Sequence, residues 1–149
     1  MCRNLLIRVA IAVTGRQMKN NIENVLVTGG AGYIGAVLVP KLLDKGHQVK
    51  VIDLYIYGEE VLDAVRGHPN LRETKGDIRD RELLEREIPG TDALIHLACI
   101  SNDPSYELDP KLGKSINYDA FVPMVVKGLE KKGILEGCPW RLKSTKELL

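Results

Sequence analysis

A glycine-rich turn between an apolar strand and an amphipathic helix constrains this chain most. The segment Asn24–Thr28 is short, apolar and rich in β-branched residues, and it runs directly into the sequence GGAG at residues 29–32. The next segment, Tyr33–Lys45, places apolar residues at helical spacing and is closed by Gly46. A strand, a glycine turn and a helix in this order begin a β-α-β unit, which needs a parallel sheet covered by helices.

The rest of the chain repeats this alternation. Further strands are expected at Gln48–Asp53, Leu71–Lys75 and Ala93–Leu97, and helices at Glu59–Arg66, from Asp80 to Glu87 and from about Lys111 to Lys132. Strands that alternate with helices predict a parallel sheet with helices on both faces, and right-handed crossovers give the strand order 3-2-1-4. The predicted fold class is α/β, a Rossmann-type doubly wound sheet.

Composition is consistent with one globular domain and excludes several functions. The 149 residues are 44% hydrophobic and 28% charged, with a formal net charge of +1. This charge gives no drive towards nucleic acid, and no apolar run has the length of a membrane span. The three cysteines (Cys2, Cys99 and Cys138) are odd in number and widely spaced, which argues against a disulfide framework or a metal site. We therefore expect a cytoplasmic protein.

The sequence predicts three regions. Residues 1–21 form an N-terminal extension, residues 22–133 the α/β domain, and residues 134–149 a basic tail. The extension contains the apolar run Leu5–Val13, but Arg8 interrupts this run and the cleavage pattern of a signal peptide is poor. An extension on the surface of the domain is therefore favoured over a secretion signal.

Gly29, Gly32 and Gly35 form a G-x-x-G-x-x-G motif at the start of the first helix. In such a motif the first glycine permits a tight turn, the second lets the backbone approach a pyrophosphate, and the third lets the helix pack close to the sheet. Free N–H groups at the helix start, where Tyr33 and Ile34 lie, suit phosphate oxygens. No Lys-Ser/Thr pair follows the glycines, which excludes a nucleoside-triphosphatase loop. The motif predicts a dinucleotide site.

Asp53 ends the second predicted strand, 24 positions after Gly29. A carboxylate near this spacing accepts hydrogen bonds from the ribose hydroxyls of a dinucleotide, and it repels a 2′-phosphate. No arginine or lysine in Leu54–Tyr57 compensates that repulsion, so NAD is favoured over NADP as the cofactor. The alternative is a solvated carboxylate at a strand end.

The string TGGAGYIG (residues 28–35) resembles the extended short-chain dehydrogenase/reductases, and more narrowly the NAD-dependent epimerase/dehydratase family that acts on nucleotide sugars. Three further segments resemble motifs of this family in the same order: GDIRD (Gly76–Asp80), IHLAC (Ile95–Cys99) and SINYDA (Ser115–Ala120). The resemblance extends roughly over Val25–Lys132. It implies the same α/β fold with NAD as cofactor.

The resemblance also implies roles for single residues. Asp77 and Ile78 would hold the adenine, although Asp77 could instead cap a turn. Asn117 would organise the active site from behind, although it could be a surface residue of a helix.

The motif on the fourth strand carries further candidates. Its residues Leu97, Ala98 and Cys99 would line the pyrophosphate and the ribose on the nicotinamide side. Cys99 is favoured as a small residue near the cofactor over a nucleophile, because no partnered base is evident. His96 on the same strand is favoured as a hydrogen-bonded core residue over a catalyst.

The family's catalytic Tyr-x-x-x-Lys pair is missing. None of the five tyrosines is followed four positions later by lysine, so no catalytic residue is assigned. The tail Gly133–Leu149 does not resemble the family's fifth strand, which predicts a sheet truncated after the fourth strand and its helix. An intact relative would also bind a nucleotide sugar.

Two other functions stay open. The chain could be a non-catalytic dinucleotide-binding module. It could also be an interaction protein that associates with itself or with a partner through the exposed edge of the fourth strand.

Overall fold

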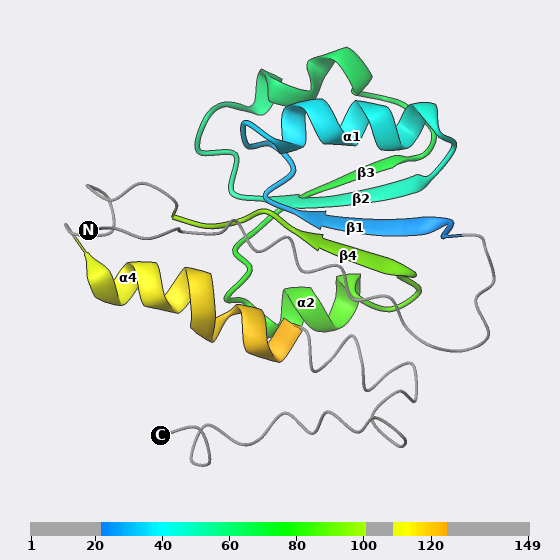
Figure 1. Ribbon diagram of the computed structural model, residues 1–149. Helices are drawn as coiled ribbons and strands as arrows, with labels where there is room; N and C mark the ends of the chain where they lie inside the picture. Colours follow the sequence, from blue (N-terminus) through cyan, green and yellow to red (C-terminus); the bar gives the residue numbers. More distant parts are fainter. Residues whose placement is uncertain (1–21, 101–108, 125–149) are drawn as a thin grey trace, which may run out of the picture.

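The computed structural model describes residues 22–100 and 109–124 (Figure 1). The predicted N-terminal extension, the basic tail, the loop at 101–108 and the end of the last helix lie outside these residues, as do Cys2 and Cys138.

Four parallel strands form one sheet in the order β3-β2-β1-β4, as predicted. The strands are β1 (Asn24–Thr28), β2 (Gln48–Asp53), β3 (Leu71–Lys75) and β4 (Ala93–His96). The bounds of the first three agree with the prediction.

The end of β4 differs from the prediction by one residue. The backbone N–H groups of Leu97 and Ala98 both donate to the carbonyl of Thr28, at 2.8 and 3.0 Å. Two successive N–H groups that share one acceptor leave the regular ladder, so Leu97 follows the strand instead of ending it.

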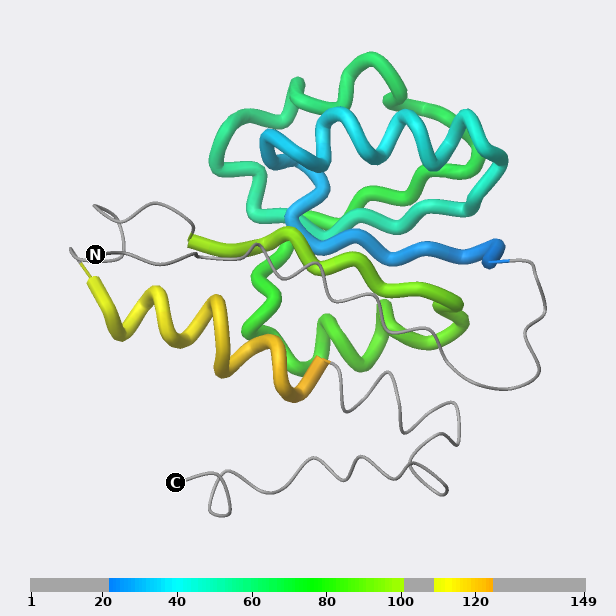
Figure 2. The backbone as a smooth tube through the Cα atoms, in the orientation of Figure 1, coloured from blue at the N-terminus to red at the C-terminus, as the bar shows by residue number. Residues whose placement is uncertain are grey.

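Helices cover both faces of this sheet (Figures 1 and 2). On one face, Val25 and Val27 of β1 belong to a buried cluster with residues of α1 (Gly35–Asp44). On the other face, Leu26 belongs to a second cluster with residues of α2 (Arg81–Glu87). Successive residues of one strand thus enter opposite cores, the pattern of a strand buried on both faces. No helix within the described ranges is long and apolar enough to cross a membrane.

The first two crossovers differ in detail from the prediction. Helix α1 begins at Gly35 and not at Tyr33, and the segment after β2 is a 3₁₀ helix over Glu59–Val65 and not an α-helix. Its residue Leu62 leaves helical geometry (φ −105°, ψ 15°) while its side chain is fully buried against α1 and the sheet. Packing of Leu62 therefore overrides regular helix geometry in this short segment.

Asp80 caps α2 as predicted. Its side chain accepts hydrogen bonds from the backbone N–H groups of Glu82 and Leu83, at 3.0 and 3.2 Å. The predicted burial of Leu83 and Leu84 is also confirmed, because both belong to the second cluster.

The last described segment is not the single regular helix that the sequence predicts. Helix α4 (Pro110–Lys114) is followed by a π-helical turn over Ser115–Asp119. The N–H of Ala120 donates to the carbonyl of Ser115, five residues earlier. Such turns insert one extra residue into a helix and are frequent at functional sites. Asn117 lies in this one.

Candidate functional site

The candidate residues gather at the carboxyl ends of the strands. All four strands are parallel, so these ends share one edge of the sheet. The connections from β1 and β4 leave from adjacent strands in opposite directions across the sheet, and ligands of doubly wound folds bind in the crevice at this switch point. The glycine turn follows β1 here, and Ala98 follows β4.

Gly29 joins these two connections by a backbone contact. Its φ of 76° is in the left-handed region, and an added Cβ would lie 2.7 Å from both the Cα of Ala98 and the carbonyl carbon of Leu97. Its N–H donates to the carbonyl of Ile52 at the end of β2. Gly29 therefore serves the predicted turn, and it also lets the β4 connection lie directly against the turn.

Gly35 is required by a close backbone contact. An added Cβ would lie 2.6 Å from the Cα of Gly30 and closer still to its carbonyl, so the start of α1 packs directly on the glycine turn. Gly30 in turn packs on Val51, with 2.7 Å to a side-chain carbon. The sequence analysis did not single out Gly30, although its place next to Gly29 was a usable signal.

Gly32 differs from these three glycines. The nearest atom to an added Cβ is the carbonyl oxygen of Gly29 at 3.3 Å, and its φ lies outside the left-handed region. Packing within the protein therefore requires a glycine less strictly here than at the other three positions. The sequence analysis assigned Gly32 to close approach of a pyrophosphate, and a small residue here leaves the backbone of the turn open to such a ligand.

Two N–H groups stand next to Gly32 at the start of α1. The backbone N–H groups of Tyr33 and Ile34 donate to no acceptor among the described residues, and the side chain of Tyr33 is 94% exposed. Unpaired N–H groups at a helix start form an anion site. Tyr33 and Ile34 thus suit phosphate oxygens through their backbone, while their side chains remain exposed.

Asp53 holds two loops together. One carboxylate oxygen accepts the N–H of Ala31 in the glycine turn at 2.9 Å, and the other accepts the N–H of Tyr55 at 2.7 Å. A carboxylate offers about four acceptor positions, so these bonds leave capacity for hydroxyl groups. Asp53 is therefore not a merely solvated carboxylate, and it is fixed beside the turn that follows β1.

Tyr55 is a feature that the sequence analysis missed. It is the one described non-glycine residue with a positive φ, at 55°. Its hydroxyl donates to Glu73 on β3 at 2.7 Å, and partial burial together with Glu73 raises the pKa of the phenol well above its usual range. This bond fixes the strained loop after β2 and, with it, the position of the Asp53 carboxylate.

Asp77 and Ile78 follow β3 at the same edge. The carboxylate of Asp77 accepts hydrogen bonds from the backbone N–H and from Nε of Arg79, at 2.8 and 3.0 Å, and the Arg79 guanidinium lowers the pKa of Asp77. The side chain of Ile78 is buried in the second cluster, which leaves its backbone as the part that can face a ligand. The bond from the Arg79 N–H agrees with the alternative that Asp77 caps a turn, whereas the side-chain pair with Arg79 was not predicted.

His96 has the environment of a core histidine, as favoured from the sequence. Its Nδ1 lies 2.7 Å from the hydroxyl of buried Thr28, its register partner on β1, and its ring stacks on Phe121 at 5.3 Å between centroids. Burial lowers the pKa of its imidazole, which favours the neutral form.

The segment after β4 is held by Asn117. The N–H of Ile100 donates to Oδ1 of Asn117 and Nδ2 of Asn117 donates to the carbonyl of Ile100, both at 2.8 Å. This pair of bonds fixes the backbone that begins with Leu97 and Ala98 from the side of the helix. Cys99, which lies between Ala98 and Ile100 in the sequence, is exposed. Within the described residues no group of acidic, histidine and cysteine side chains could hold a metal ion.

This arrangement defines a class of protein, the α/β proteins with a glycine turn at the sheet switch point. The model of the NAD dependent epimerase/dehydratase family matches residues 25–125. The chain belongs to this family.

Individual relatives agree in the same region. UDP-glucose 4-epimerase of Streptococcus mutans is 43% identical over 81 residues, which is 52% of this chain and 23% of the relative. A 3β-hydroxysteroid dehydrogenase/Δ5→4-isomerase of Mycobacterium tuberculosis is 37% identical over 83 residues, 56% of this chain and 21% of the relative. Among solved structures, dTDP-glucose 4,6-dehydratase from Streptomyces venezuelae with NAD bound has a TM-score of 0.67 and 32% identity, over 72% of this chain and 36% of that one.

The chain thus spans between about a fifth and about a third of the length of these proteins. It is related to NAD-dependent epimerases and dehydratases of nucleotide sugars, and the match lies in the part of the fold that carries the glycine turn.

Proposed function

We propose that this chain binds NAD at the carboxyl edge of its sheet and is the cofactor-binding part of a nucleotide-sugar epimerase or dehydratase. The observation that carries the proposal is the contrast among the glycines. Gly29, Gly30 and Gly35 are needed by contacts within the protein, whereas Gly32 is the least constrained by packing. Gly32 lies next to the N–H groups of the helix start that have no acceptor in the part of the chain the structure describes, where a pyrophosphate would be held.

Each candidate residue has a role in this proposal. The N–H groups of Tyr33 and Ile34 bind phosphate oxygens at the positive end of α1. Asp53 accepts the ribose hydroxyls, and its charge disfavours a 2′-phosphate, so NAD is preferred over NADP.

The remaining candidates lie on either side of these groups. The turn at Asp77 and Ile78 holds the adenine, whereas Leu97, Ala98 and Cys99 lie along the ribose on the nicotinamide side. Asn117 positions this last segment through Ile100.

Bound NAD would supply a hydride acceptor, and none of the five tyrosines of this chain is followed four positions later by lysine. We infer that the domain extends over residues 22–133, that it lies in the cytoplasm, and that the chain alone does not turn over a nucleotide sugar. An NAD-dependent turnover assay with UDP-glucose and dTDP-glucose tests this inference. A robust rate that survives Tyr118→Phe and Tyr106→Phe would show that other residues carry the chemistry.

Calorimetric titration with NAD tests the binding proposal. We expect the affinity to fall stepwise from wild type to Gly32→Ala and Gly32→Val, because a growing side chain enters the path of the pyrophosphate. Thermal melting of the three proteins serves as the control, because the new Cβ would lie 3.3 Å from the carbonyl oxygen of Gly29 and any loss of stability must be separated from loss of binding. Equal NAD affinity in all three contradicts the proposal.

A second candidate function, association through β4, rests on the edge of the sheet. Among the described residues β4 pairs only with β1, so one side of its backbone has no strand partner there. Unpaired strand edges recruit further strands. We expect the average mass in sedimentation experiments to rise with protein concentration. A monomer at all concentrations that also melts sharply contradicts this function.

A further inference from the structure

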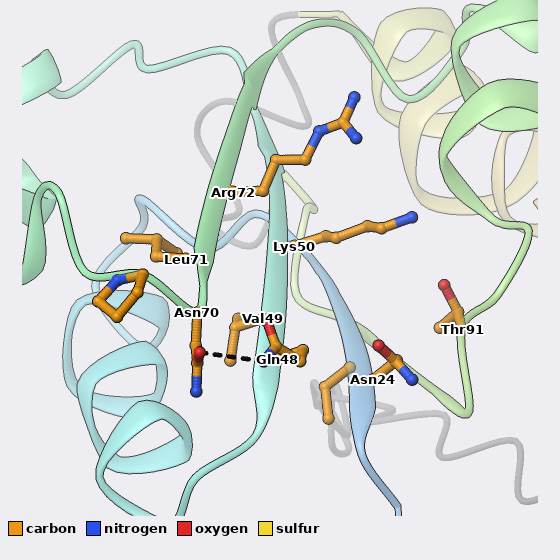
Figure 3. A pocket seen from close by; sticks show the side chains of 10 residues that line it. Asn24, Gln48, Val49, Lys50, Asn70, Leu71, Arg72 and Thr91 are labelled. Carbon is orange, nitrogen blue, oxygen red and sulfur yellow. Dashed lines mark hydrogen bonds between the residues drawn. The ribbon is translucent and has the colours of Figure 1, made fainter.

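A polar pocket lies at the opposite end of the sheet from the glycine turn, where the strands begin (Figure 3). Its walls come from the first residues of β1, β2 and β3 and from the loop before β4. The polar side chains that line it are Asn24, Gln48, Lys50, Asn70, Arg72 and Thr91. Both charged residues in its wall are basic.

The two basic residues are fixed next to each other. Lys50 and Arg72 are register partners on β2 and β3, so both side chains leave the same face of the sheet, and Figure 3 shows them extending in the same direction. Like charges on neighbouring strands repel each other. A negatively charged group next to these two side chains would reduce this repulsion.

Glu87 is that negatively charged group. Its side chain is 2% exposed and lies 3.4 Å from the guanidinium of Arg72 and 3.2 Å from that of Arg86. The ammonium group of Lys50 donates to the carbonyls of Glu87 and Pro89 instead of to the carboxylate. One buried carboxylate thus pairs with two guanidinium groups, while the third cation, Lys50, is held by carbonyl oxygens. The nearby Asp92 is engaged by N–H groups of Glu23 and Asn24.

Hydrogen-bonding groups surround this excess positive charge. The Nε2 of Gln48 donates to Oδ1 of Asn70 at 3.0 Å, which holds both amide groups at the mouth of the pocket. The hydroxyl of Thr91 is buried and has no hydrogen-bond partner, and its residue is 7% exposed. A buried hydroxyl without a partner costs free energy that a bound acceptor would recover. The pocket therefore presents cations, amide N–H groups and one unsatisfied hydroxyl.

We propose that this pocket is a second binding site, distinct from the dinucleotide site, for a small oxyanion such as a phosphate group. Lys50 and Arg72 supply the charge, and Gln48, Asn70 and Thr91 supply donors to the oxygens. Arginine and lysine in one site favour phosphate because charge-assisted hydrogen bonds to its oxygens are strong. The two basic side chains disfavour a cation as the ligand, and the amide groups disfavour an apolar ligand.

The test is a titration of the full 149-residue chain with inorganic phosphate, in which NMR spectra are recorded at each phosphate concentration. The side-chain NH₂ signals of Gln48 and Asn70 report on this pocket, and the backbone signals of Gly29–Gly35 report separately on the glycine turn. We expect saturable shifts of the amide signals in the wild type. Arg72→Gln should weaken this binding about tenfold, the loss expected for one charge-assisted bond. The matched control is Arg81→Gln, which removes an exposed arginine from the other end of α2 and should leave the affinity unchanged.

Thr91→Val gives an independent readout. Without phosphate, this variant should melt at a higher temperature than the wild type, because an unsatisfied buried hydroxyl is replaced by a methyl group of similar shape. Phosphate should then raise the melting temperature of the wild type more than that of the variant. Shifts that do not saturate, or equal affinities in Arg72→Gln and Arg81→Gln, would overturn the proposal.

Discussion

The two ends of the sheet are built by different kinds of contact. At the carboxyl end, backbone meets backbone: Gly29 lies against Leu97 and Ala98, and Gly35 against Gly30, at distances that exclude any side chain. At the amino end, contacts run through side chains instead, as in the Arg72–Glu87 ion pair, the bond of the Lys50 ammonium to the Glu87 carbonyl and the Gln48–Asn70 pair. The first end has a fixed backbone that can bind a ligand through N–H groups, whereas the pocket at the second end offers polar side chains.

Because of this difference, the two ends should tolerate substitutions to different extents. A backbone contact is lost with any residue larger than glycine, whereas a side-chain contact can be removed one group at a time. Substitutions at glycine contacts should therefore cost more stability than substitutions of single polar side chains.

Gly29→Ala should destabilise the protein by about 3 kcal/mol or more, because strain at its left-handed φ adds to overlap with Ala98. The matched control is Gly46→Ala, whose φ of 84° is similar but whose added Cβ meets no atom within 4 Å. That control should lose only about 1–2 kcal/mol. Urea denaturation of both variants measures the difference, and equal losses would show that the contact with Ala98 does not restrict the site.

Asp53→Ala should weaken NAD binding by about 1.5–3 kcal/mol, the range for hydrogen bonds to a charged group. It should also reduce the difference in affinity between NAD and NADP. Part of this loss comes from the freed N–H groups of Ala31 and Tyr55. Calorimetry with both cofactors measures it. A wild type that already prefers NADP contradicts the role given to Asp53.

Asn117→Ala should destabilise the protein by about 1–2 kcal/mol, since two hydrogen bonds to the backbone of Ile100 are lost. Asn117→Asp is a second variant, because it keeps the Oδ1 acceptor but turns a carboxylate oxygen towards the carbonyl of Ile100, where Nδ2 donates in the wild type. Thermal melting should place both variants below the wild type, with the aspartate variant no more stable than the alanine variant. An alanine variant that melts like the wild type would argue that the π turn, and not these bonds, fixes the segment.

His96 should give a small dependence of stability on pH. Burial lowers its pKa in the folded state, so the unfolded chain binds the proton more readily and stability falls as the pH drops below the unfolded pKa of about 6.5. The free energy of unfolding, measured between pH 7.5 and about pH 5.5, should fall less in His96→Gln than in the wild type. An unchanged slope would show that another group carries the dependence.

The sequence predicts those parts of the molecule that depend on local patterns of residues. The strand order and the position of the glycine turn were predictable because apolar β-branched runs and glycine spacing are local patterns. The strained Tyr55 and the π turn around Asn117 were not, since they depend on contacts with Glu73 and Ile100 in other segments. The contact of Gly35 with Gly30 is local, but it depends on the exact path of the turn, which glycine spacing alone does not fix. The amino-end pocket gave no signal because its residues are scattered from Asn24 to Thr91.

The most direct test of the whole account is to map NAD on the isotopically labelled wild-type chain by NMR. The account predicts saturable shifts at Gly29–Gly35, Asp53 and Ala98, with the side-chain signals of Gln48 and Asn70 unchanged. Shifts centred on Gln48 and Asn70, or no saturable shift at the glycine turn, would contradict the assignment of the dinucleotide site to the carboxyl end of the sheet.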